Sequence, residues 1–393
     1  MTALTLAGRL REVEGSPTLA LAAKAKALAK AGKSVVDLTA GEPDMPTPEP
    51  IKQAGTQAIA ENKTRYTPVA GIPELRDAVS SWANKQYGTS YQASQVLVSC
   101  GAKHSLYNIF QAICQEGDEV VIFSPYWVSY PPMVRLAGAT PVIVETTERD
   151  AFLPDPAALK HALTPATKAV ILNSPSNPTG AVIDEDRLRA IARLAHEHGF
   201  VIVSDEIYDQ LVYAPAKHRS ILHADGSLAE QTVIVGGMSK TYSMTGWRIG
   251  YALGPKTLIE AMDRIQSHST SNPTSISQYA ALAGLTGPQD AVAQMVKIFQ
   301  ARRDKMVAGF NALPGLRCFK PLGAFYLWCD VSGLGQSSDA TAAQWLDDIH
   351  VATVPGEGFG APGWLRLSFA AAEKTLDEGL SRIGNWLSKR GKS

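Results

Sequence analysis

Apolar runs rich in β-branched residues recur through the middle of the chain and alternate with amphipathic stretches. The runs are QVLVS (95–99), EVVIF (119–123), PVIVE (141–145), KAVILN (168–173), FVIVSD (200–205), TVIVG (232–236) and RIGYAL (248–253). Between most of them the apolar positions follow a helical period, as in HSLYNIFQAICQ, where one face carries Leu106, Ile109, Phe110 and Ile113. Strands buried on both faces and separated by helices predict an α/β fold with a largely parallel central sheet. Ligands of such sheets bind beyond the carboxyl ends of the strands, so we expect the chemistry at that edge.

The two ends of the chain show a different pattern of predicted helices and strands. Residues 16–32 are typical of an Ala-rich helix that ends at Gly32, and a strand is expected to follow at 34–39. From about residue 288 the pattern predicts a long helix, then strands at FYLWCDV (325–331), HVATV (350–354) and WLRLSFA (364–370), and a terminal helix. We therefore predict a large domain over residues 48–290 and a smaller α/β domain formed by residues 1–47 and 291–393.

Composition narrows the class of protein. The 393 residues are 45% hydrophobic and 19% charged, as in an ordinary globular protein, and 37 Lys and Arg balance 37 Asp and Glu. No net field favours nucleic acid or an anionic membrane, so an anion site must be local. No apolar run reaches membrane-spanning length, and the amino terminus acquires charges before an apolar core of signal length appears. These features predict a cytoplasmic protein that binds neither nucleic acid nor membrane.

The cysteines and histidines do not indicate a metal site. Cys100, Cys114, Cys318 and Cys329 are too scattered for a Cys-x-x-Cys pair and few for a disulfide framework, which favours a reducing compartment. The spaced pair His196 and His198 lies in a polar helix end, where solvated side chains are the better interpretation. We therefore predict no metal.

Two nucleotide-binding motifs are matched only formally. Residues 356–361 fit a relaxed G-x-G-x-x-G/A fingerprint, but Pro362 and Gly363 stop the helix that should receive the pyrophosphate, so a plain turn is favoured. AGKS (31–34) lacks the glycine five positions before the lysine that a Walker loop needs, and it is interpreted as a helix stop.

Polar residues follow two of the predicted strands. Asp205 closes FVIVSD at the ligand-facing edge, where it could pair with a cationic ring nitrogen or simply cap a helix. Asn177, in the turn NSPSNPTG (173–180), would be presented at the same edge with an amide that can donate to a phenolate oxygen. Tyr208 would add a second donor if a helix begins at Asp205. Both segments are also consistent with ordinary turn and capping chemistry.

Two further segments could complete an anion and amine site. In VSCGAKHS (98–105) the chain turns at Gly101 and Ala102 into a helix whose first amides could hold a phosphate, although many such turns bind nothing. GGMSKTYSMTGWRIG (236–250) places Ser239, Lys240 and Arg248 beyond another strand. Alone, Lys240 would be a surface residue. Together with the other signals it is the amine that a pyridoxal-type cofactor needs for a Schiff base.

The motifs resemble those of fold type I pyridoxal-phosphate enzymes, and within them the class I aminotransferases. The matching segments occur in family order: GEPDMPTP, YTPVAGIPELR, SPYWVSYPPMVRLAG, NSPSNPTGAV, VSDEIYDQLVY, SKTYSMTGWRIGY, GAFYLW and LRLSFA. They cover almost the whole chain. The branch that they resemble most is the bacterial aspartate aminotransferases typified by thermophile enzymes.

The resemblance implies roles for individual residues in a site that holds pyridoxal 5'-phosphate. Lys240 would bind the cofactor and move the proton during transfer, Asp205 would keep the ring nitrogen protonated, and Asn177 and Tyr208 would bond the phenolate oxygen. Trp127 would stack on the ring. The phosphate would be held by Ala102, Lys103, Ser239, Arg248 and, from the neighbouring subunit of a homodimer, Tyr66. The substrate carboxylate would be bound by Arg366, helped by Asn177 and the backbone near Gly41.

The resemblance also implies the substrate. Lys103 matches the lysine that recognises the distal carboxylate of aspartate or glutamate, although it could be a phosphate counter-ion. The expected reaction is a ping-pong transfer from L-aspartate to 2-oxoglutarate, giving oxaloacetate and L-glutamate. Another aminotransferase, acting on alanine, aromatic amino acids or prephenate, or a C–S lyase of the same fold are the alternatives. Relatives that use prephenate carry a basic residue where this chain has Glu14, and this difference counts against prephenate as a substrate.

Overall fold

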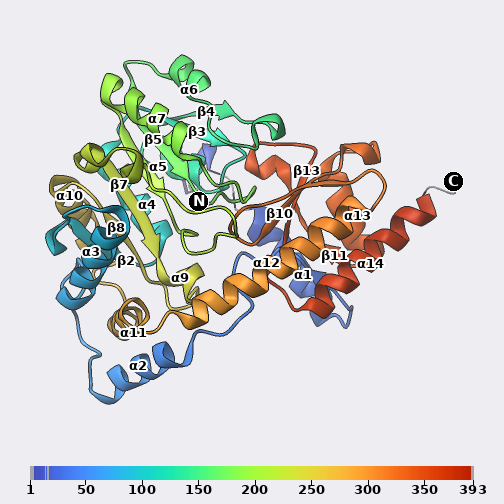
Figure 1. The fold of residues 1–393 in the computed structure, drawn as a ribbon, viewed down its shortest axis with the longest axis horizontal. Helices are drawn as coiled ribbons and strands as arrows, with labels where there is room; N and C mark the ends of the chain where they lie inside the picture. Colours follow the sequence, from blue (N-terminus) through green and yellow to red (C-terminus); the bar gives the residue numbers. More distant parts are fainter. Residues whose placement is uncertain (1–3, 14, 16, 391–393) are drawn as a thin grey trace.

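The computed structural model describes residues 4–13, 15 and 17–390, and a seven-stranded sheet forms its centre (Figure 1). In spatial order the strands are β2 (Val96–Ser99), β8 (Gly250–Leu253), β7 (Thr232–Gly237), β6 (Val201–Asp205), β5 (Thr167–Asn173), β3 (Glu119–Ser124) and β4 (Thr140–Glu145). Neighbouring strands from β7 to β4 run parallel, while β8 is antiparallel to both β7 and β2. The predicted α/β fold with a mostly parallel sheet is confirmed.

Helices cover both faces of this sheet. One face packs against α3 (Pro73–Tyr87), α7 (Glu185–His198) and α11 (Ser275–Thr286), with α2 (Glu49–Ala60) lying on α11. The other face packs against α4 (Ala102–Ile113), α5 (Tyr130–Leu136) and α10 (Lys256–Ser267). Successive strand residues alternate between the two cores, since Ile202 belongs to the first and Val203 to the second. This double burial explains why the strands are apolar runs rather than alternating ones.

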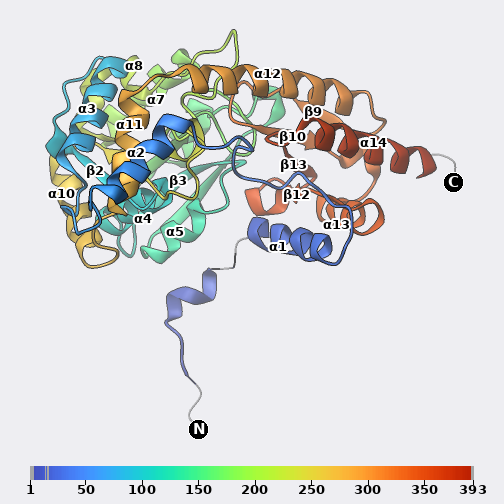
Figure 2. The ribbon, with the colours of Figure 1, turned by 90° about the horizontal axis from the view of Figure 1, so that it is seen from below.

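Both chain ends meet beside the large sheet. There β1 (Val36–Asp37) pairs parallel with β11 (Val351–Ala352), and an antiparallel sheet has the order β12 (Val354–Pro355), β13 (Trp364–Ser368), β10 (Tyr326–Asp330) and β9 (Arg317–Phe319). The helices here are α1 (Pro17–Lys30), α12 (Asp290–Asn311), α13 (Ser338–Ile349) and α14 (Glu373–Arg390), and Figure 2 shows α1 and α13 side by side. Val292 of α12 joins the core of the large sheet and Phe299 joins the second core. The predicted boundaries near residues 48 and 290 agree with this change of core and stay a prediction.

The remaining helices are short connections. They are α6 (Pro156–Ala162), α8 (Ile221–Ala224), α9 (Met238–Thr241), η1 (Gly8–Glu12), η2 (Ala93–Gln95), η3 (Glu148–Asp150), η4 (Gly226–Glu230), η5 (Ser332–Leu334) and η6 (Gly356–Phe359). Residues 356–359, for which the sequence favoured a plain turn, form the short 3-10 helix η6. As the sequence suggested, α1 stops before Gly32 with its φ of +83°, and α7 ends at His198. Among the described residues, no helix is long and apolar enough to cross a membrane.

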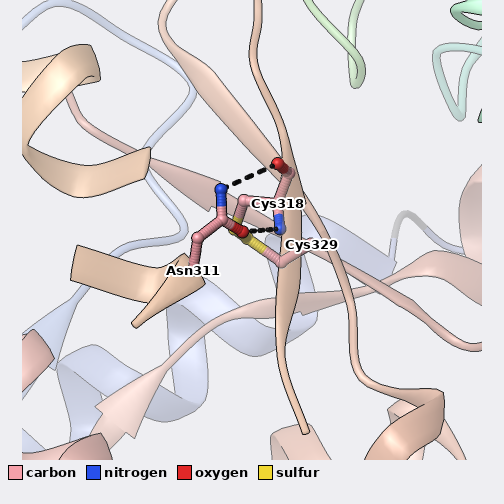
Figure 3. The surroundings of a disulfide bond; sticks show 3 residues. All are labelled: Asn311, Cys318 and Cys329. Atoms are coloured by element: carbon pink, nitrogen blue, oxygen red, sulfur yellow. Dashed lines mark hydrogen bonds between the residues drawn. A yellow bond between two sulfur atoms is a disulfide. The ribbon is translucent and has the colours of Figure 1, made fainter. Parts of the chain in front are cut away.

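A disulfide joins Cys318 of β9 to Cys329 of β10 (Figure 3). The two residues lie directly opposite each other in the antiparallel register, with their Cα atoms 4.1 Å apart, and Asn311 brackets Cys318 through hydrogen bonds to its backbone. The sequence interpretation, which saw only scattered cysteines, missed this bridge. Residues separated by 11 positions become neighbours only when their strands pair, and spacing alone does not reveal that pairing.

Candidate active site

A cavity of about 500 Å³ lies at the carboxyl edge of the large sheet. It is lined by all but one of the residues singled out from the sequence: Gly41, Ala102, Lys103, Trp127, Asn177, Asp205, Tyr208, Ser239, Lys240, Arg248 and Arg366. The exception is Tyr66, whose side chain is 91% exposed and does not line this cavity. Residues from both chain ends and from five strand ends of the large sheet therefore converge on one space.

Lys240 lies in α9, a single helical turn that follows β7, and not in the loop that the sequence suggested. Its Nζ donates a hydrogen bond to the backbone carbonyl of Gly41, which comes from the other end of the chain. Burial lowers the pKa of Lys240 to about 8, although the nearby carboxylate of Glu42 acts in the opposite direction. A useful fraction of this amine is therefore uncharged near neutral pH, as a nucleophile or proton acceptor must be.

Asp205 is the last residue of β6 and is 3% exposed. Its Oδ2 accepts a hydrogen bond of 2.6 Å from the hydroxyl of Tyr130, and its Oδ1 accepts one from the backbone N–H of Ile207. Burial raises the pKa of Asp205 to about 6, and these two donors act against that rise. The carboxylate is thus held in a fixed orientation at the base of the cavity.

No helix begins at Asp205. Residues 207–210 form a turn, so the helical face that was to carry Tyr208 does not exist. The Asp205 carboxylate accepts a hydrogen bond from the N–H of Ile207, as a capping side chain does. The chain then forms a turn, because the N–H of Leu211 donates to the carbonyl of Tyr208. Tyr208 nevertheless lines the cavity, and its hydroxyl lies 3.0 Å from that of Tyr326. Tyr208 thus lies in the cavity, but not on the helical face that the sequence offered as one possibility.

Arg366 is a buried cation that comes from β13 and is 2% exposed. Its Nη1 donates to Oδ1 of Asn177 at 3.0 Å and its Nη2 donates to the carbonyl of Thr39 at 3.1 Å. The guanidinium lies over the ring of Tyr326, with the central carbon 4.4 Å from the ring centre. Its Nε has no hydrogen-bond partner within residues 4–13, 15 and 17–390. Among the described residues no carboxylate forms an ion pair with this guanidinium, so it is suited to bind the carboxylate of a ligand.

The start of α4 forms a cradle for an anion. Gly101 precedes the helix with φ +86°, and in the described part of the chain no side chain caps the helix start, which leaves the first amides available to a ligand. A Cβ on Gly101 would approach Nη2 of Arg248 to 2.7 Å, and one on Gly250 would approach the nitrogen of Ala102 to 2.2 Å. The two glycines therefore let Arg248 and the helix start come together.

Lys103 stands at the same helix start. Its Nζ lies 4.9 Å from the ring centre of Trp127, a cation–π contact. Burial, and then the charge of Arg248, lower the pKa of Lys103. The structure thus places Lys103 in the same cavity as Arg248 and Arg366.

Sequence reasoning missed several residues of the site. Tyr130 and Tyr326 bond residues that were predicted, and Glu42, held by the hydroxyl of Thr245 at 2.6 Å, lies beside Lys240. Tyr130 and Tyr326 occur inside the quoted motifs SPYWVSYPP and GAFYLW, so the signal was present. Nothing local distinguished them from core aromatic residues.

A buried ion pair lies directly behind Asp205. Glu206 is 2% exposed and accepts hydrogen bonds from Tyr87, Ser204, Ser220 and, at 2.8 Å, from the imidazole of His218. Burial acts to raise the pKa of Glu206, but the charge and hydrogen bond of His218 outweigh it and the pKa is lowered. Burial likewise acts to lower the pKa of His218, and Glu206 raises it overall. Each partner therefore favours the charged form of the other.

This pair gives a prediction for stability against pH. The stability that Glu206 contributes is fully present above its unfolded pKa, and it is lost as the pH falls through the lowered pKa of the folded state. The stability that His218 contributes is fully present below its unfolded pKa, and it is lost as the pH rises through the raised pKa of the folded state. Glu206→Gln should lower the free energy of unfolding by about 3–5 kcal/mol, most strongly between about pH 4.5 and 6.5. Urea unfolding at a fixed protein and cofactor concentration measures this. The matched control is Glu260→Gln, an exposed partner of Lys256, with an expected change below about 1 kcal/mol. Equal effects of the two substitutions would contradict the prediction.

A model of the family "Aminotransferase class I and II" matches residues 33–383. The chain belongs to this family. An aspartate aminotransferase from Geobacillus stearothermophilus is 47% identical over 392 residues, which cover 98% of this chain and 100% of the relative. An aspartate/prephenate aminotransferase from Thermus thermophilus is 46% identical over 389 residues, covering 98% and 99%. The resemblance inferred from the sequence motifs is confirmed.

Solved structures of class I and II aminotransferases share the fold. The aspartate aminotransferase from Thermus thermophilus with maleate superposes with a TM-score of 0.93 at 44% identity, covering 98% of this chain and 100% of that one. The enzyme from Rhizobium meliloti has a TM-score of 0.94 at 38% identity, covering 98% and 99%.

The family generally uses pyridoxal phosphate, and the chemistry of this cavity fits that group. The uncapped start of α4 and Arg248 suit a phosphate, and Asp205 suits a protonated ring nitrogen. Lys240, with its lowered pKa, suits an aldehyde.

Proposed function

We propose that this protein is an aspartate aminotransferase that uses pyridoxal 5'-phosphate to move the amino group of L-aspartate to 2-oxoglutarate in a ping-pong reaction. The observation that carries the proposal is the cavity itself, which combines Lys240 with its lowered pKa, the buried carboxylate of Asp205 and the cationic side chains of Arg366, Lys103 and Arg248. The names of the relatives and the maleate in one relative's structure, a dicarboxylate, support the same substrate class.

The cofactor, when bound, supplies an electron sink that stabilises the carbanion formed at the substrate Cα. Asp205 would hold the proton on the ring nitrogen, and Asn177 and Tyr208 would donate to the phenolate oxygen. Ser239, Arg248 and the amides of Ala102 and Lys103 would bind the phosphate, and Trp127 would pack on the ring.

Lys240 performs the proton transfer. Its Nζ, whose pKa burial lowers to about 8, takes the proton from the substrate Cα and later returns it to complete the amino transfer. Arg366 binds the α-carboxylate through its planar guanidinium while Asn177 and the backbone near Gly41 orient the substrate. The buried position of Arg366 excludes water from this contact.

A homodimer with shared active sites is part of the proposal. Tyr66 is 91% exposed within one chain, as is expected of a residue that completes the phosphate site of a second subunit. Sedimentation velocity tests this, and a monomer at assay concentrations would rule it out.

Prephenate is the second candidate substrate, because one relative is named for both activities. Glu14, the position on which the sequence argument against prephenate rests, lies outside the described residues. Aspartate therefore stays the primary proposal.

The half-reaction tests the proposed function directly. Aspartate or glutamate added to the holoenzyme without an oxo acid should change the visible absorption of the bound cofactor, with release of the oxo acid. An unchanged spectrum with both amino acids would reject the acidic substrate class. Conversion by alanine or an aromatic amino acid alone would point to a different aminotransferase, and ammonia with pyruvate from cystathionine would point to a lyase.

Lys103→Ala should separate dicarboxylic from other substrates. Loss of a charge-assisted contact to the distal carboxylate is expected to lower kcat/KM for aspartate by about 10- to 100-fold. The value for alanine should change by less than about threefold. Steady-state kinetics with both amino acids measure the difference. Lys52→Ala, at an exposed lysine of α2, is the control and should change neither value. Equal losses for aspartate and alanine would remove Lys103 as the specificity residue and leave it as a phosphate counter-ion.

A further inference from the structure

Tyr130 is the one side chain in the described ranges that donates a hydrogen bond to the carboxylate of Asp205. It is the first residue of α5, and several contacts fix the orientation of its ring. The backbone N–H of Tyr130 donates to the carbonyl of Trp127, the two rings meet edge to face with centres 5.3 Å apart, and the side chain is 1% exposed. The hydroxyl therefore has a fixed direction, toward Oδ2 of Asp205 at 2.6 Å.

The carboxylate of Asp205 is strongly affected by this contact because so little else stabilises its charge. The other donor to it is a backbone N–H, that of Ile207 at 3.2 Å. The charged groups nearby act in opposite directions, since Glu206 disfavours the ionised carboxylate and Lys240 favours it. Burial has already raised the pKa of Asp205 to about 6, so a small further rise would leave the carboxyl group protonated near neutral pH.

We propose that Tyr130 is a positioning residue that acts through Asp205 and decides which atom holds the proton shared between Asp205 and the ring nitrogen of the bound cofactor. This inference rests on the proposed cofactor site but not on which amino acid is the substrate. With the Tyr130 hydroxyl donating to Oδ2, the carboxylate is the weaker base and the proton stays on the ring nitrogen. Without that donor the carboxylate becomes the stronger base, and the same proton moves to an Asp205 oxygen. The ring then becomes neutral and is a poorer electron sink.

Tyr130→Phe tests the proposal because it removes one oxygen and keeps the ring. The holoenzyme is loaded with pyridoxal phosphate labelled with ¹⁵N in the ring, and the chemical shift of that nitrogen is measured by solid-state NMR without substrate. The wild-type signal should be that of a protonated pyridine. In the variant the ratio of nitrogen-protonated to carboxyl-protonated forms should fall by about 10- to 100-fold, the effect of one hydrogen bond to a charged group. In steady-state kinetics kcat should fall by about tenfold, with KM for the amino acid within about threefold of the wild-type value.

Tyr213→Phe is the matched control. Tyr213 is also fully buried and its hydroxyl also has one partner in the described structure, the carbonyl of Ala324, but it does not line the cavity. In the Tyr213→Phe variant, the ¹⁵N shift of the cofactor and kcat should equal those of the wild type. A merely structural role of Tyr130 would lower thermal stability in both variants and leave the nitrogen shift unchanged in both.

A graded substitution covers the case in which Tyr130→Phe does not fold. With 3-fluorotyrosine at position 130 the hydroxyl is a stronger donor, so the nitrogen-protonated fraction should equal or exceed that of the wild type. A shift toward neutral pyridine with 3-fluorotyrosine, or an unchanged shift in Tyr130→Phe, would overturn the proposal. Because the spectrum is recorded without an amino acid, failure of aspartate as a substrate would leave this result intact, and the two proposals fail separately.

Discussion

Replacing Lys240 with alanine should reduce the rate of amino transfer by about 10⁴-fold or more, because the variant loses both the nucleophilic amine and the proton-transfer group. The structure explains why no other side chain would substitute. The Nζ of Lys240 bonds the carbonyl of Gly41. Lys103 lies beside the anion cradle, but its Nζ contacts the ring of Trp127. Single-turnover rates with aspartate, measured on enzyme loaded with cofactor, test the expectation.

Two variants sharpen the Lys240 experiment. Lys240→Arg keeps a positive charge but stays protonated at all accessible pH values, so it should be as inactive as the alanine variant. Lys256→Ala removes an exposed lysine of α10, whose side chain is 63% exposed, and should keep the wild-type rate. A Lys240→Arg rate within about tenfold of the wild type would show that an uncharged amine is not needed at this position.

Replacing Arg366 with lysine should lower kcat/KM by about 100-fold for every amino acid, mainly through KM, because lysine keeps the charge but not the planar fork. The guanidinium bonds Asn177 through Nη1 and the carbonyl of Thr39 through Nη2. A lysine ammonium has three donors but no planar fork, so it cannot keep both contacts and also bind a carboxylate through two parallel hydrogen bonds. The lost contacts leave buried acceptors unsatisfied, at a cost of about 1–3 kcal/mol each. Steady-state kinetics with aspartate and alanine measure the change.

The pattern across substrates distinguishes Arg366 from Lys103. Arg366→Lys should weaken aspartate and alanine alike, since both carry an α-carboxylate, while Lys103→Ala should weaken aspartate selectively. Arg317→Lys is the control, because that arginine is 60% exposed and bonds Glu148 and Asp330 at the surface. A selective loss of aspartate activity in Arg366→Lys would mean that this arginine binds the distal carboxylate instead.

The position of most site residues could be predicted because each follows directly from the end of a strand. Asp205 closes β6, Lys240 follows β7 and Lys103 follows β2 by a short turn, so the strand pattern alone places all three at one edge of a parallel sheet. Arg366 was less local, since it lies inside β13 of the second sheet. It was identified from the family motif rather than from the position of a strand end.

Local structure around these residues was harder to predict than their location. A helix capped by Asp205 was one of two interpretations, since Asp followed by Glu-Ile-Tyr is good capping chemistry, but the chain forms a turn at 207–210. There the buried contacts of Tyr208 with Tyr326 and of Glu206 with His218 outweigh local helix propensity.

The sequence by itself determined the α/β fold, the edge of the sheet where the cavity lies and the chemical groups that line it, because strand periodicity and strand ends are local properties of the chain. Only the tertiary structure decided which of those groups touch. Three contacts join residues whose proximity the sequence pattern does not reveal. They are those of Tyr130 with Asp205, of Arg366 with the carbonyl of Thr39, and of Cys318 with Cys329. Burial decided the rest, because the pKa values of Lys240 and Asp205 shift only when packing removes water from their charges.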